Sequence, residues 1–420
     1  MKRVVILGGG FGGLRCAMTL GPKLKGKAQV CLIDRQSYHS YTPSLYEVAT
    51  AFRGTALVRT SLNEEHFKEM IGSVIAFPFS DTLPKRNVSF IHSAIRSIDA
   101  VSKYVVLQDG TKEPFDYLII GLGSQTNYFG VEGADKYCLP IKTVGDALRI
   151  RDRVLSVFAQ SKKTRAPVTI AVVGAGLAGF EVATEMVMFV QHLKDRHSLH
   201  DIPVKIVLIE AMERVLSACS SAFCVASEKR LSALGVSVMV NKRIVKVQNG
   251  ALFFGDGSSL KTDVQIWSAG IQGSPVLKDS KGLPVLTKRG QLSVSPFLSL
   301  PEHDHIFVVG DCVDWQDKES DIVVPQTAWA AEQEASIVAY NVVASLCNAE
   351  KKPYIPHIVG MVASAGGKYA IAEIRGFLLT GFFAWVLKRM IDLKYLLSLY
   401  KPHTAFIIWI KGVRLFGRND

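Results

Sequence analysis

Several features are absent from this sequence of 420 residues. No apolar run reaches the roughly 20 residues that a helix needs to cross a bilayer, so a membrane-spanning helix is not expected. The seven cysteines form no CxxC pair and no zinc-spaced cluster with histidine, which argues against a zinc module and favours buried, reduced thiols. No metal-ligand set and no Ser/His/Asp hydrolase arrangement is evident. The first apolar run, residues 4–7, is too short for a signal peptide.

The composition is that of a globular protein with excess positive charge. Hydrophobic residues make up 48% and charged residues 20%, and the length predicts two or three domains. The formal net charge is +12. Residues 361–420 hold nine Lys or Arg and three Asp or Glu, so 9 − 3 = +6 lies in this last segment. Because its cations alternate with apolar runs, the segment favours an anionic membrane over nucleic acid as partner.

The N-terminal residues predict a loop that binds a dinucleotide. Residues 4–7 are typical of a buried parallel strand, and Gly8, Gly10 and Gly13 follow as GxGxxG before a helical stretch. Such glycines permit a tight turn, close approach of a pyrophosphate and close helix packing, and the helix N-terminus attracts phosphate. The next strand ends at Asp34, 34 − 13 = 21 residues after the last glycine, where a carboxylate can bind a ribose diol.

The same arrangement occurs a second time. Residues 169–173 predict a strand, Gly174, Gly176 and Gly179 repeat the glycine pattern, and a later strand ends at Glu210. The gap of 210 − 179 = 31 residues predicts a longer crossover. A glutamate there repels a 2′-phosphate and therefore favours NADH over NADPH. Two complete loops predict two dinucleotides, a tightly held flavin and a nicotinamide that exchanges.

Further segments resemble those of flavoproteins with two dinucleotide-binding domains. FDYLIIGLGSQTN (115–127), which contains Gly123, resembles the segment that leaves the flavin domain, and VQIWSAGIQGSP (264–275) resembles the returning one. IFVVGDCVDW (306–315) resembles the second flavin motif, which places Asp311 at the ribityl chain. The resemblance implies an α/β fold with two Rossmann-like domains, the nicotinamide domain being inserted in the flavin domain.

Within that superfamily the sequence resembles the type II NADH dehydrogenases, which are single-subunit NADH:quinone oxidoreductases. The segments that carry this resemblance are DRQSYHSYTPSLYEVATA (34–51), LPIKTVGDALRIRDRV (139–154), PQTAWAAEQEA (325–335) and GGKYAIAEIRGFLLTGFFAWVLKR (366–389). It implies tightly bound FAD, NADH as substrate, and two-electron transfer to a membrane quinone without proton pumping, at the entry to a respiratory chain.

The resemblance also implies particular site residues. Glu181 follows the nicotinamide loop and is expected to gate the nicotinamide or relay a proton, the alternative being a favourable contact with the positive helix end. Gln333 is what remains of a quinone motif in which Trp329 replaces the first glutamine, and Lys368 is expected near the quinone unless it is an exposed loop lysine. Three further candidates follow Asp34 in the sequence, and they either line the flavin or quinone pocket or belong to ordinary packing: His39, Tyr41 and Pro43.

The C-terminal segment predicts helices that dock on a membrane surface. Residues 377–387 are apolar or small, and Pro402 is expected to separate two helices. Cations flank the apolar runs and suit anionic lipid: Lys388, Arg389, Lys394, Lys401, Lys411 and Arg414. Aromatic residues suit the headgroup region: Trp385, Trp409, Tyr395 and Tyr400. The expected location is peripheral, on the cytoplasmic face. The alternative is a core helix with a dimer interface, so a homodimer is left open.

The expected domains follow from these segments. We expect a flavin domain at 1–124 and 276–360, a nicotinamide domain at 125–275 and an anchor at 361–420. Residues 95–110 predict a β-hairpin with an Asp-Gly turn.

Three alternative functions remain, the first being an NADH-dependent flavoprotein reductase with a different electron acceptor. A sulfide:quinone reductase needs two redox cysteines, for which Cys138 and Cys347 are only a loose match, and Cys347 lies in a helical stretch. A binding protein that senses flavin and NADH without catalysis would use the basic surface for a partner, but no nucleic-acid motif is present.

Overall fold

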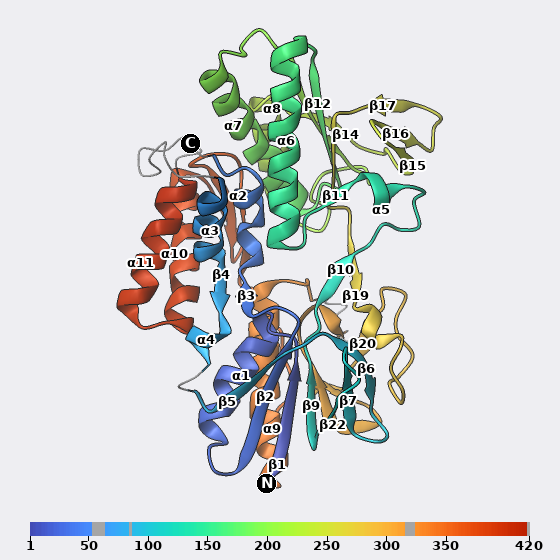
Figure 1. The fold of residues 1–420 in the computed structure, drawn as a ribbon, viewed down its shortest axis with the longest axis vertical. Helices are drawn as coiled ribbons and strands as arrows, with labels where there is room; N and C mark the ends of the chain where they lie inside the picture. Colours follow the sequence, from blue (N-terminus) through green and yellow to red (C-terminus); the bar gives the residue numbers. More distant parts are fainter. Residues whose placement is uncertain (53–63, 84–85, 316–323, 418–420) are drawn as a thin grey trace. The chain divides into compact units, whose positions relative to one another are not determined.

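The computed structural model describes residues 1–52, 64–83, 86–315 and 324–417, and the chain forms two compact units (Figure 1). Each unit is assembled from three separate stretches of the sequence. The first unit comprises Met1–Ser40, Ala76–Gln125 and Ile271–Ile358, and the second comprises Tyr41–Ile75, Thr126–Gly270 and Val359–Asp420.

The first unit is built on a six-stranded sheet. Five of its strands are parallel, and β21 is an antiparallel edge strand. The central strands are apolar along their whole length because both faces of the sheet are covered, as parallel sheets require. Two helices, α1 and α9, pack against each other. In sheet order the strands are β21 (Ser299–Leu300), β22 (His303–Val308), β9 (Tyr117–Ile120), β1 (Lys2–Leu7), β2 (Ala28–Asp34) and β5 (Val88–His92), and the helices are α1 (Phe11–Lys23) and α9 (Ala328–Leu346).

An antiparallel meander follows β5 in the first unit. The predicted hairpin is confirmed, but residues 100–103 connect its two strands. The Asp-Gly turn lies after the second strand, where Gly110 has a positive φ of 87°, and leads to a third strand. The strands are β6 (Ile95–Asp99), β7 (Tyr104–Leu107) and β8 (Lys112–Pro114). Shorter elements of this unit are β3 (Tyr38–Ser40), β4 (Ala76–Pro78), α4 (Phe79–Thr82), β19 (Ile271–Gly273), η3 (Pro275–Leu277), β20 (Leu292–Ser293), η4 (Gly310–Cys312) and β23 (Val313–Asp314), and β10 (Ser124–Thr126) lies at its boundary.

The second unit has its own parallel sheet, flanked by long helices. Its order is β11-β18-β12-β13-β14, with every pair parallel. The strands are β11 (Leu139–Pro140), β18 (Val264–Trp267), β12 (Val168–Val173), β13 (Val204–Ile209) and β14 (Ser237–Met239), and the helices are α6 (Val144–Thr164), α7 (Leu177–His197) and α8 (Ser221–Ala233). Helix α7 is 21 residues long, which accounts for most of the longer crossover before Glu210.

Two antiparallel sheets and further helices complete this unit. Helix α2 packs on α6 and α7, α10 packs on β24, β25 and β26, and α11 packs on α10 and α3. The strands are β15 (Ile244–Gln248), β16 (Ala251–Phe254), β17 (Ser259–Lys261), β24 (Gly360–Ser364), β25 (Ala370–Ile374) and β26 (Phe377–Gly381). The helices are η1 (Thr42–Ser44), α2 (Leu45–Ala49), α3 (Glu64–Ile75), α5 (Ala134–Tyr137), α10 (Phe382–Leu399) and α11 (Pro402–Phe416).

The α/β fold with two Rossmann-like sheets is therefore confirmed, and Pro402 begins α11 as expected. None of the helices in the described ranges is both long and apolar enough to span a bilayer. The predicted boundaries differ from the observed units, because residues 41–75 and the C-terminal segment pack with the second parallel sheet. Assigning flavin to 1–124 with 276–360 and nicotinamide to 125–275 stays a prediction.

One part of the sequence interpretation is wrong. Lys388 and Arg389 are expected at the surface, but they are only 6% and 8% exposed and are ion-paired inside the second unit. Trp385 and Tyr395, expected among lipid headgroups, are also buried. All four residues lie in α10, whose packing on β24, β25, β26 and α11 turns these side chains inward. A linear reading of apolar runs does not reveal this packing.

Candidate functional site

The first glycine loop has the geometry that a pyrophosphate needs. Gly8 has a φ of 91°, and a Cβ there would lie 2.3 Å from the carbonyl oxygen of Gly121. A Cβ on Gly13 would lie 1.8 Å from the carbonyl oxygen of Gly8, so the helix and the strand touch at this point. A Cβ on Gly10 would meet no heavy atom within 4 Å. The loop thus leaves open space at the N-terminus of α1, where a phosphate is favoured.

The acid of the first loop lies against it. Asp34 ends β2, and its carboxylate accepts hydrogen bonds from the backbone N–H groups of Gly9 (2.5 Å) and Gln36 (2.7 Å). Burial raises the pKa of this carboxyl. His39 contacts the same loop, because its Nδ1 lies 2.9 Å from the Gly9 carbonyl oxygen and must carry the hydrogen. Burial lowers the pKa of His39 to about 4, so the ring is neutral.

Gly123 and Asp311 lie at the same edge of the first unit's sheet as the first glycine loop. They follow β9 and β22, whose carboxyl ends lie beside that of β1. Asp311 accepts a hydrogen bond from the Ser124 hydroxyl, and Cys312 donates its thiol to the Gly123 carbonyl oxygen at 3.2 Å. Ligands of open parallel sheets bind at this edge. The donor set and the open glycine loop therefore fit FAD, which Gly10, Asp34, Gly123 and Asp311 would hold.

The second unit repeats the first arrangement. Gly174 has a φ of 94°, a Cβ on Gly179 would lie 1.8 Å from the Gly174 carbonyl oxygen, and a Cβ on Gly176 would meet nothing within 4 Å. Glu210 follows β13 and accepts hydrogen bonds from the backbone N–H groups of Ala175 (2.7 Å) and Met212 (3.0 Å). These residues fit the adenosine end of NADH.

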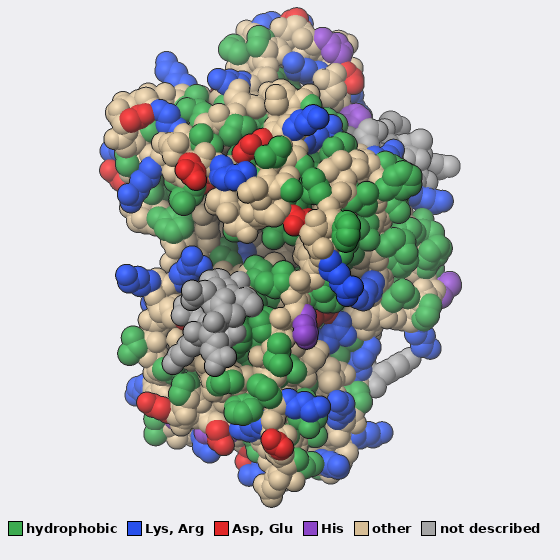
Figure 2. Space-filling view, turned by 180° about the vertical axis from the view of Figure 1, so that it is seen from behind, with side chains coloured by type: hydrophobic (Ala, Val, Ile, Leu, Met, Phe, Trp, Pro, Cys, Tyr) green, Lys and Arg blue, Asp and Glu red, His purple; other side chains and the backbone are tan. Residues whose placement is uncertain are grey.

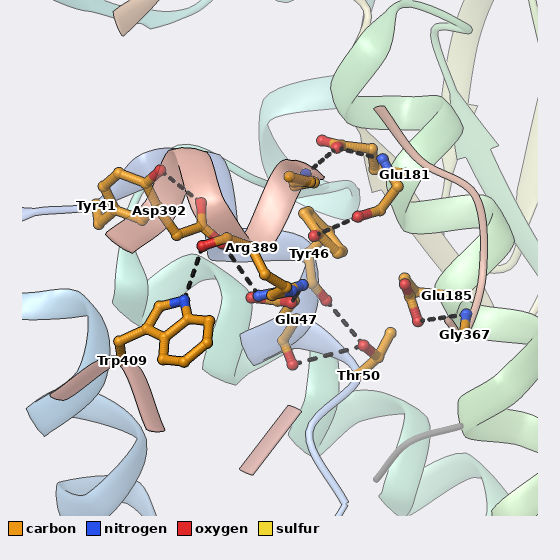
Figure 3. Close-up of polar contacts among 12 residues, drawn as sticks. Tyr41, Tyr46, Glu47, Thr50, Glu181, Glu185, Gly367, Arg389, Asp392 and Trp409 are labelled. Atoms are coloured by element: carbon orange, nitrogen blue, oxygen red, sulfur yellow. Dashed lines mark hydrogen bonds and ion pairs between the residues drawn. The ribbon is translucent and has the colours of Figure 1, made fainter. Parts of the chain in front are cut away.

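Glu181 forms a buried ion pair. Its Oε1 accepts hydrogen bonds from Lys388 Nζ at 2.6 Å and from the Ser364 backbone N–H at 3.0 Å (Figure 3). Only 12% of the Glu181 side chain and 8% of the Lys388 side chain are exposed. Lys388 also lies over the Tyr46 ring, 4.6 Å from its centroid. Burial raises the pKa of Glu181 and Lys388 opposes that rise, so its proton affinity depends on two opposing effects.

Most of the other predicted site residues have surroundings different from those of this pair, whereas Tyr41 contacts a charged residue beside it. The Gln333 amide donates to the His357 carbonyl oxygen at 3.0 Å and accepts from the His357 N–H at 3.1 Å, so both its ends bind backbone. Trp329 donates to the same carbonyl oxygen at 3.2 Å. Lys368 is exposed in the turn between β24 and β25. The Tyr41 hydroxyl donates to Asp392 at 2.7 Å, and Pro43 lies in η1.

Sequence reasoning missed several buried charges. Glu47, Arg389 and Asp392 form an ion cluster in the second unit, and Glu334 of α9 is buried in the first. A possible signal was the pair Lys388-Arg389 inside an apolar helix, where unpaired charge is not tolerated. Glu334 accepts from the Gly310 N–H at 2.6 Å and lines a pocket of about 390 Å³ with Gln326 and Thr327.

The cysteines do not form a redox pair in the described part of the chain. All seven are free thiols, Cys347 is exposed at the end of α9, and burial raises the pKa of Cys138 to about 12. Across the same described ranges, no three His, Cys, Asp or Glu side chains gather as a metal site.

Comparisons with known proteins agree with this geometry. A family model described as pyridine nucleotide-disulphide oxidoreductase matches residues 2–335. A type II NADH:quinone oxidoreductase of Mycobacterium tuberculosis is 29% identical over 97% of this chain and 87% of its own length. An NADH dehydrogenase-like protein of Bacillus subtilis is 30% identical over 74% of this chain and 77% of its own length.

Solved structures share the fold. An NDH2 of Plasmodium falciparum in complex with NADH has a TM-score of 0.81 at 20% identity, covering 99% of both chains. The sulfide:quinone oxidoreductase of Aquifex aeolicus has a TM-score of 0.75 at 22% identity, covering 95% of this chain and 91% of its own. With its two glycine loops, their paired acids and these relatives, the chain belongs to the pyridine nucleotide-disulphide oxidoreductase family, and its resemblance to the type II NADH:quinone oxidoreductases is confirmed.

Proposed function

We propose that this protein is an FAD-dependent NADH:quinone oxidoreductase that works at a membrane surface. The observation that carries the proposal is the duplicated loop. In each unit an acid at the end of the second strand accepts a hydrogen bond from the backbone N–H just after the first glycine, at Gly9 and at Ala175. Full-length relatives named type II NADH:quinone oxidoreductase support the same enzyme class.

The residues of the chain bind and orient the two nucleotides. Bound FAD would accept a hydride from NADH and pass its two electrons on to a quinone. Gly10 and the N-terminus of α1 admit one pyrophosphate, and Gly176 with the N-terminus of α7 admits the other. The Glu210 carboxylate accepts from a ribose hydroxyl and repels a 2′-phosphate, which selects NADH.

The Glu181–Lys388 pair is the proposed proton-holding group for quinone reduction, which consumes two protons. Glu181 is buried against a lysine, so its proton affinity responds to whether Lys388 stays in place. Gln333 and Lys368 remain proposed quinone contacts. Both ends of the Gln333 amide bind the His357 backbone, so Gln333 contacts a quinone either beside these bonds or by exchanging one of them for a quinone oxygen.

A lipid surface is proposed as the source of quinone. Hydrophobic side chains gather over α10 and α11 (Figure 2). Exposed apolar side chains follow β26 and the start of α10, with Phe377 80% and Phe383 73% exposed. Further exposed apolar residues on β26, α10 and α11 are Leu378, Leu379, Phe382, Met390, Ile391, Leu397, Phe406 and Ile407. Exposed cations in the same part of the sequence are Lys394, Lys401, Lys411 and Arg414. This combination suits interfacial binding to anionic lipid. The cytoplasmic face and a homodimer remain parts of the proposal.

A two-step flavin experiment tests the enzyme function. Purified, FAD-loaded protein should lose its yellow colour when NADH is added without oxygen. It should regain the colour when a short-chain ubiquinone or menaquinone is added. Protein that stays yellow with NADH, or that remains bleached with both quinones, would contradict the proposal. The sulfide:quinone alternative predicts bleaching by sulfide, which the buried Cys138 thiol does not favour.

A further inference from the structure

A second buried ion pair lies beside the Glu181–Lys388 pair, and the proposed function leaves it without a role. Arg389 is the next residue of α10, and one of its terminal guanidinium nitrogens binds Glu47 of α2 (Figure 3). Its other terminal nitrogen lies 3.2 Å from Asp392 Oδ2, one turn further along α10. The exposed fractions of the Arg389 and Glu47 side chains are 9% and 5%. A buried charge pair of this kind must be closely matched, because desolvation opposes it.

The two cations of α10 point to two different helices. Successive helical residues are rotated by about 100° about the helix axis, so adjacent side chains leave the helix in different directions. Lys388 binds Glu181 of α7, and Arg389 binds Glu47 of α2. Because α2 packs on α7, both carboxylates belong to one supporting surface. Helix α10 is therefore held on that surface at two points.

Lysine alone is a poor anchor for this helix. Its ammonium is a point charge on a flexible four-carbon stem, whereas a guanidinium is a rigid fork that fixes direction. We propose that Arg389 and Glu47 are positioning residues, whose ion pair fixes the rotation and axial position of α10 and so holds the Lys388 ammonium on Glu181. This role rests on the proposed function, since it concerns the proton-holding pair of the same enzyme.

Neighbouring contacts fix the Arg389 segment from other sides. Trp409 of α11 donates its indole N–H to the Arg389 carbonyl oxygen at 2.7 Å, and Tyr41 donates to Asp392 at 2.7 Å. The Tyr46 and Ser364 hydroxyls are hydrogen-bonded at 2.7 Å, and the Ser364 N–H donates to Glu181. Trp409 of α11 and Tyr41 thus restrain Arg389 and Asp392, while Ser364 of β24 holds Glu181, the partner of Lys388.

The charges of the cluster decide which variant is informative. Three carboxylates (Glu181, Glu47 and Asp392) form ion pairs with two cations (Lys388 and Arg389), and Lys388 lies over the Tyr46 ring. A further buried carboxylate, Glu185 of α7, accepts a hydrogen bond from the Gly367 N–H. Removing Arg389 would leave buried anions uncompensated and endanger folding. Glu47→Gln instead leaves two carboxylates for two cations and keeps a side chain of the same shape. It weakens the anchor without leaving a buried charge unpaired.

The test uses the pH dependence of flavin reoxidation by quinone in full-length holoenzyme. Glu47 and Lys388 affect Glu181 in opposite directions, since Glu47 raises its pKa and Lys388 lowers it. If Glu47→Gln acted only through lost charge, the pH limb that Glu181→Gln abolishes would move to lower pH. If it lets Lys388 leave Glu181, that limb moves to higher pH. We expect the move to higher pH, with reoxidation slowed about tenfold, less than the roughly 100-fold that a 1 Å displacement can cost.

Two further comparisons complete the test. Glu47→Gln in a Glu181→Gln background should cause no additional loss, because the pair it positions is already gone. Asp201→Asn, which removes the exposed ion pair with Arg165 in the same unit, is the matched control and should match the wild type. FAD content and bleaching by NADH should stay unchanged in Glu47→Gln.

A failed positioning role and a failed enzyme function give different results. Suppose that the wild type passes the two-step flavin test. The positioning role alone is then overturned if the pH limb of quinone reoxidation is unchanged in Glu47→Gln or moves to lower pH. It is also overturned if the double variant loses further activity. A wild type that reduces no quinone would overturn the proposed function and the positioning role with it.

Discussion

Replacing Glu334 by glutamine should stabilise the protein, and increasingly so as the pH rises. Glu334 is 3% exposed in α9, and its carboxyl accepts a hydrogen bond from the Gly310 N–H at 2.6 Å. Burial outweighs that bond and raises the pKa of this carboxyl from its ordinary 4.5 to about 8. The folded protein therefore holds a proton on Glu334 over a pH range in which the unfolded chain has released it.

The sign and size follow from that difference. The folded state binds more protons between pH 4.5 and 8, so the stability contributed by neutral Glu334 is complete below 4.5 and is lost as the pH rises to 8. At about 1.4 kcal/mol per pH unit, 8 − 4.5 = 3.5 units correspond to a loss of about 5 kcal/mol, an upper limit. Glutamine does not ionise and can still accept from the Gly310 N–H. It should therefore escape this loss.

The measurement is urea unfolding of FAD-loaded wild type and Glu334→Gln at about pH 5 and about pH 8. The free-energy difference between the two proteins should be small at the lower pH and reach several kcal/mol at the higher one. Glu332→Gln is the control, because Glu332 lies on the same helix in a partly exposed pair with Arg15. Parallel pH dependences for wild type and Glu334→Gln would refute the reasoning.

Three further predictions concern the nucleotides and the lipid. Gly10→Val should yield protein without FAD, whereas Gly176→Val should retain FAD but fail to bleach with NADH, because each valine fills the open space of its own loop; equal FAD loss in both would contradict this. Glu210→Ala should lower the NADH-over-NADPH ratio of kcat/KM at least about tenfold by removing charge repulsion; an unchanged ratio would exclude that role. Phe383→Asp should weaken co-sedimentation with anionic vesicles by more than about tenfold, because about 2 kcal/mol of apolar burial in the lipid is lost. The control Val285→Asp, at a side chain 93% exposed in the other unit, should bind vesicles like the wild type. Wild-type vesicle binding by Phe383→Asp would argue against lipid contact at α10.

The local parts of the site could be predicted from sequence. Strand, glycine loop, helix and terminal acid lie within one short stretch, so the spacing of Gly8, Gly10, Gly13 and Asp34 already determines their geometry. The second loop is equally predictable although its crossover is longer. Parallel pairing of β1 with β2 then places the acid beside the glycines without any distant contact.

The long-range parts could not be predicted. Arg389 and Glu47 are 342 residues apart in the sequence, and nothing in either segment identifies the other. Lys388 and Arg389 resemble surface cations because lysine and arginine usually end apolar runs at the surface. Only the packing of α10 in the second unit turns them inward. A motif indicates Gln333, but its pairing with the His357 backbone depends on how the chain returns after α9.

The contacts between each acid and its glycine loop also bear on turnover. Asp34 and Glu210 tie down loop amides through atoms of the protein itself, so the shape of each loop is set when the chain folds. A coenzyme that binds and dissociates in every cycle then finds a preorganised loop, which lowers the entropic cost of each binding event. Such a loop suits the exchanging coenzyme that we propose for the second site, because its release then requires no local refolding.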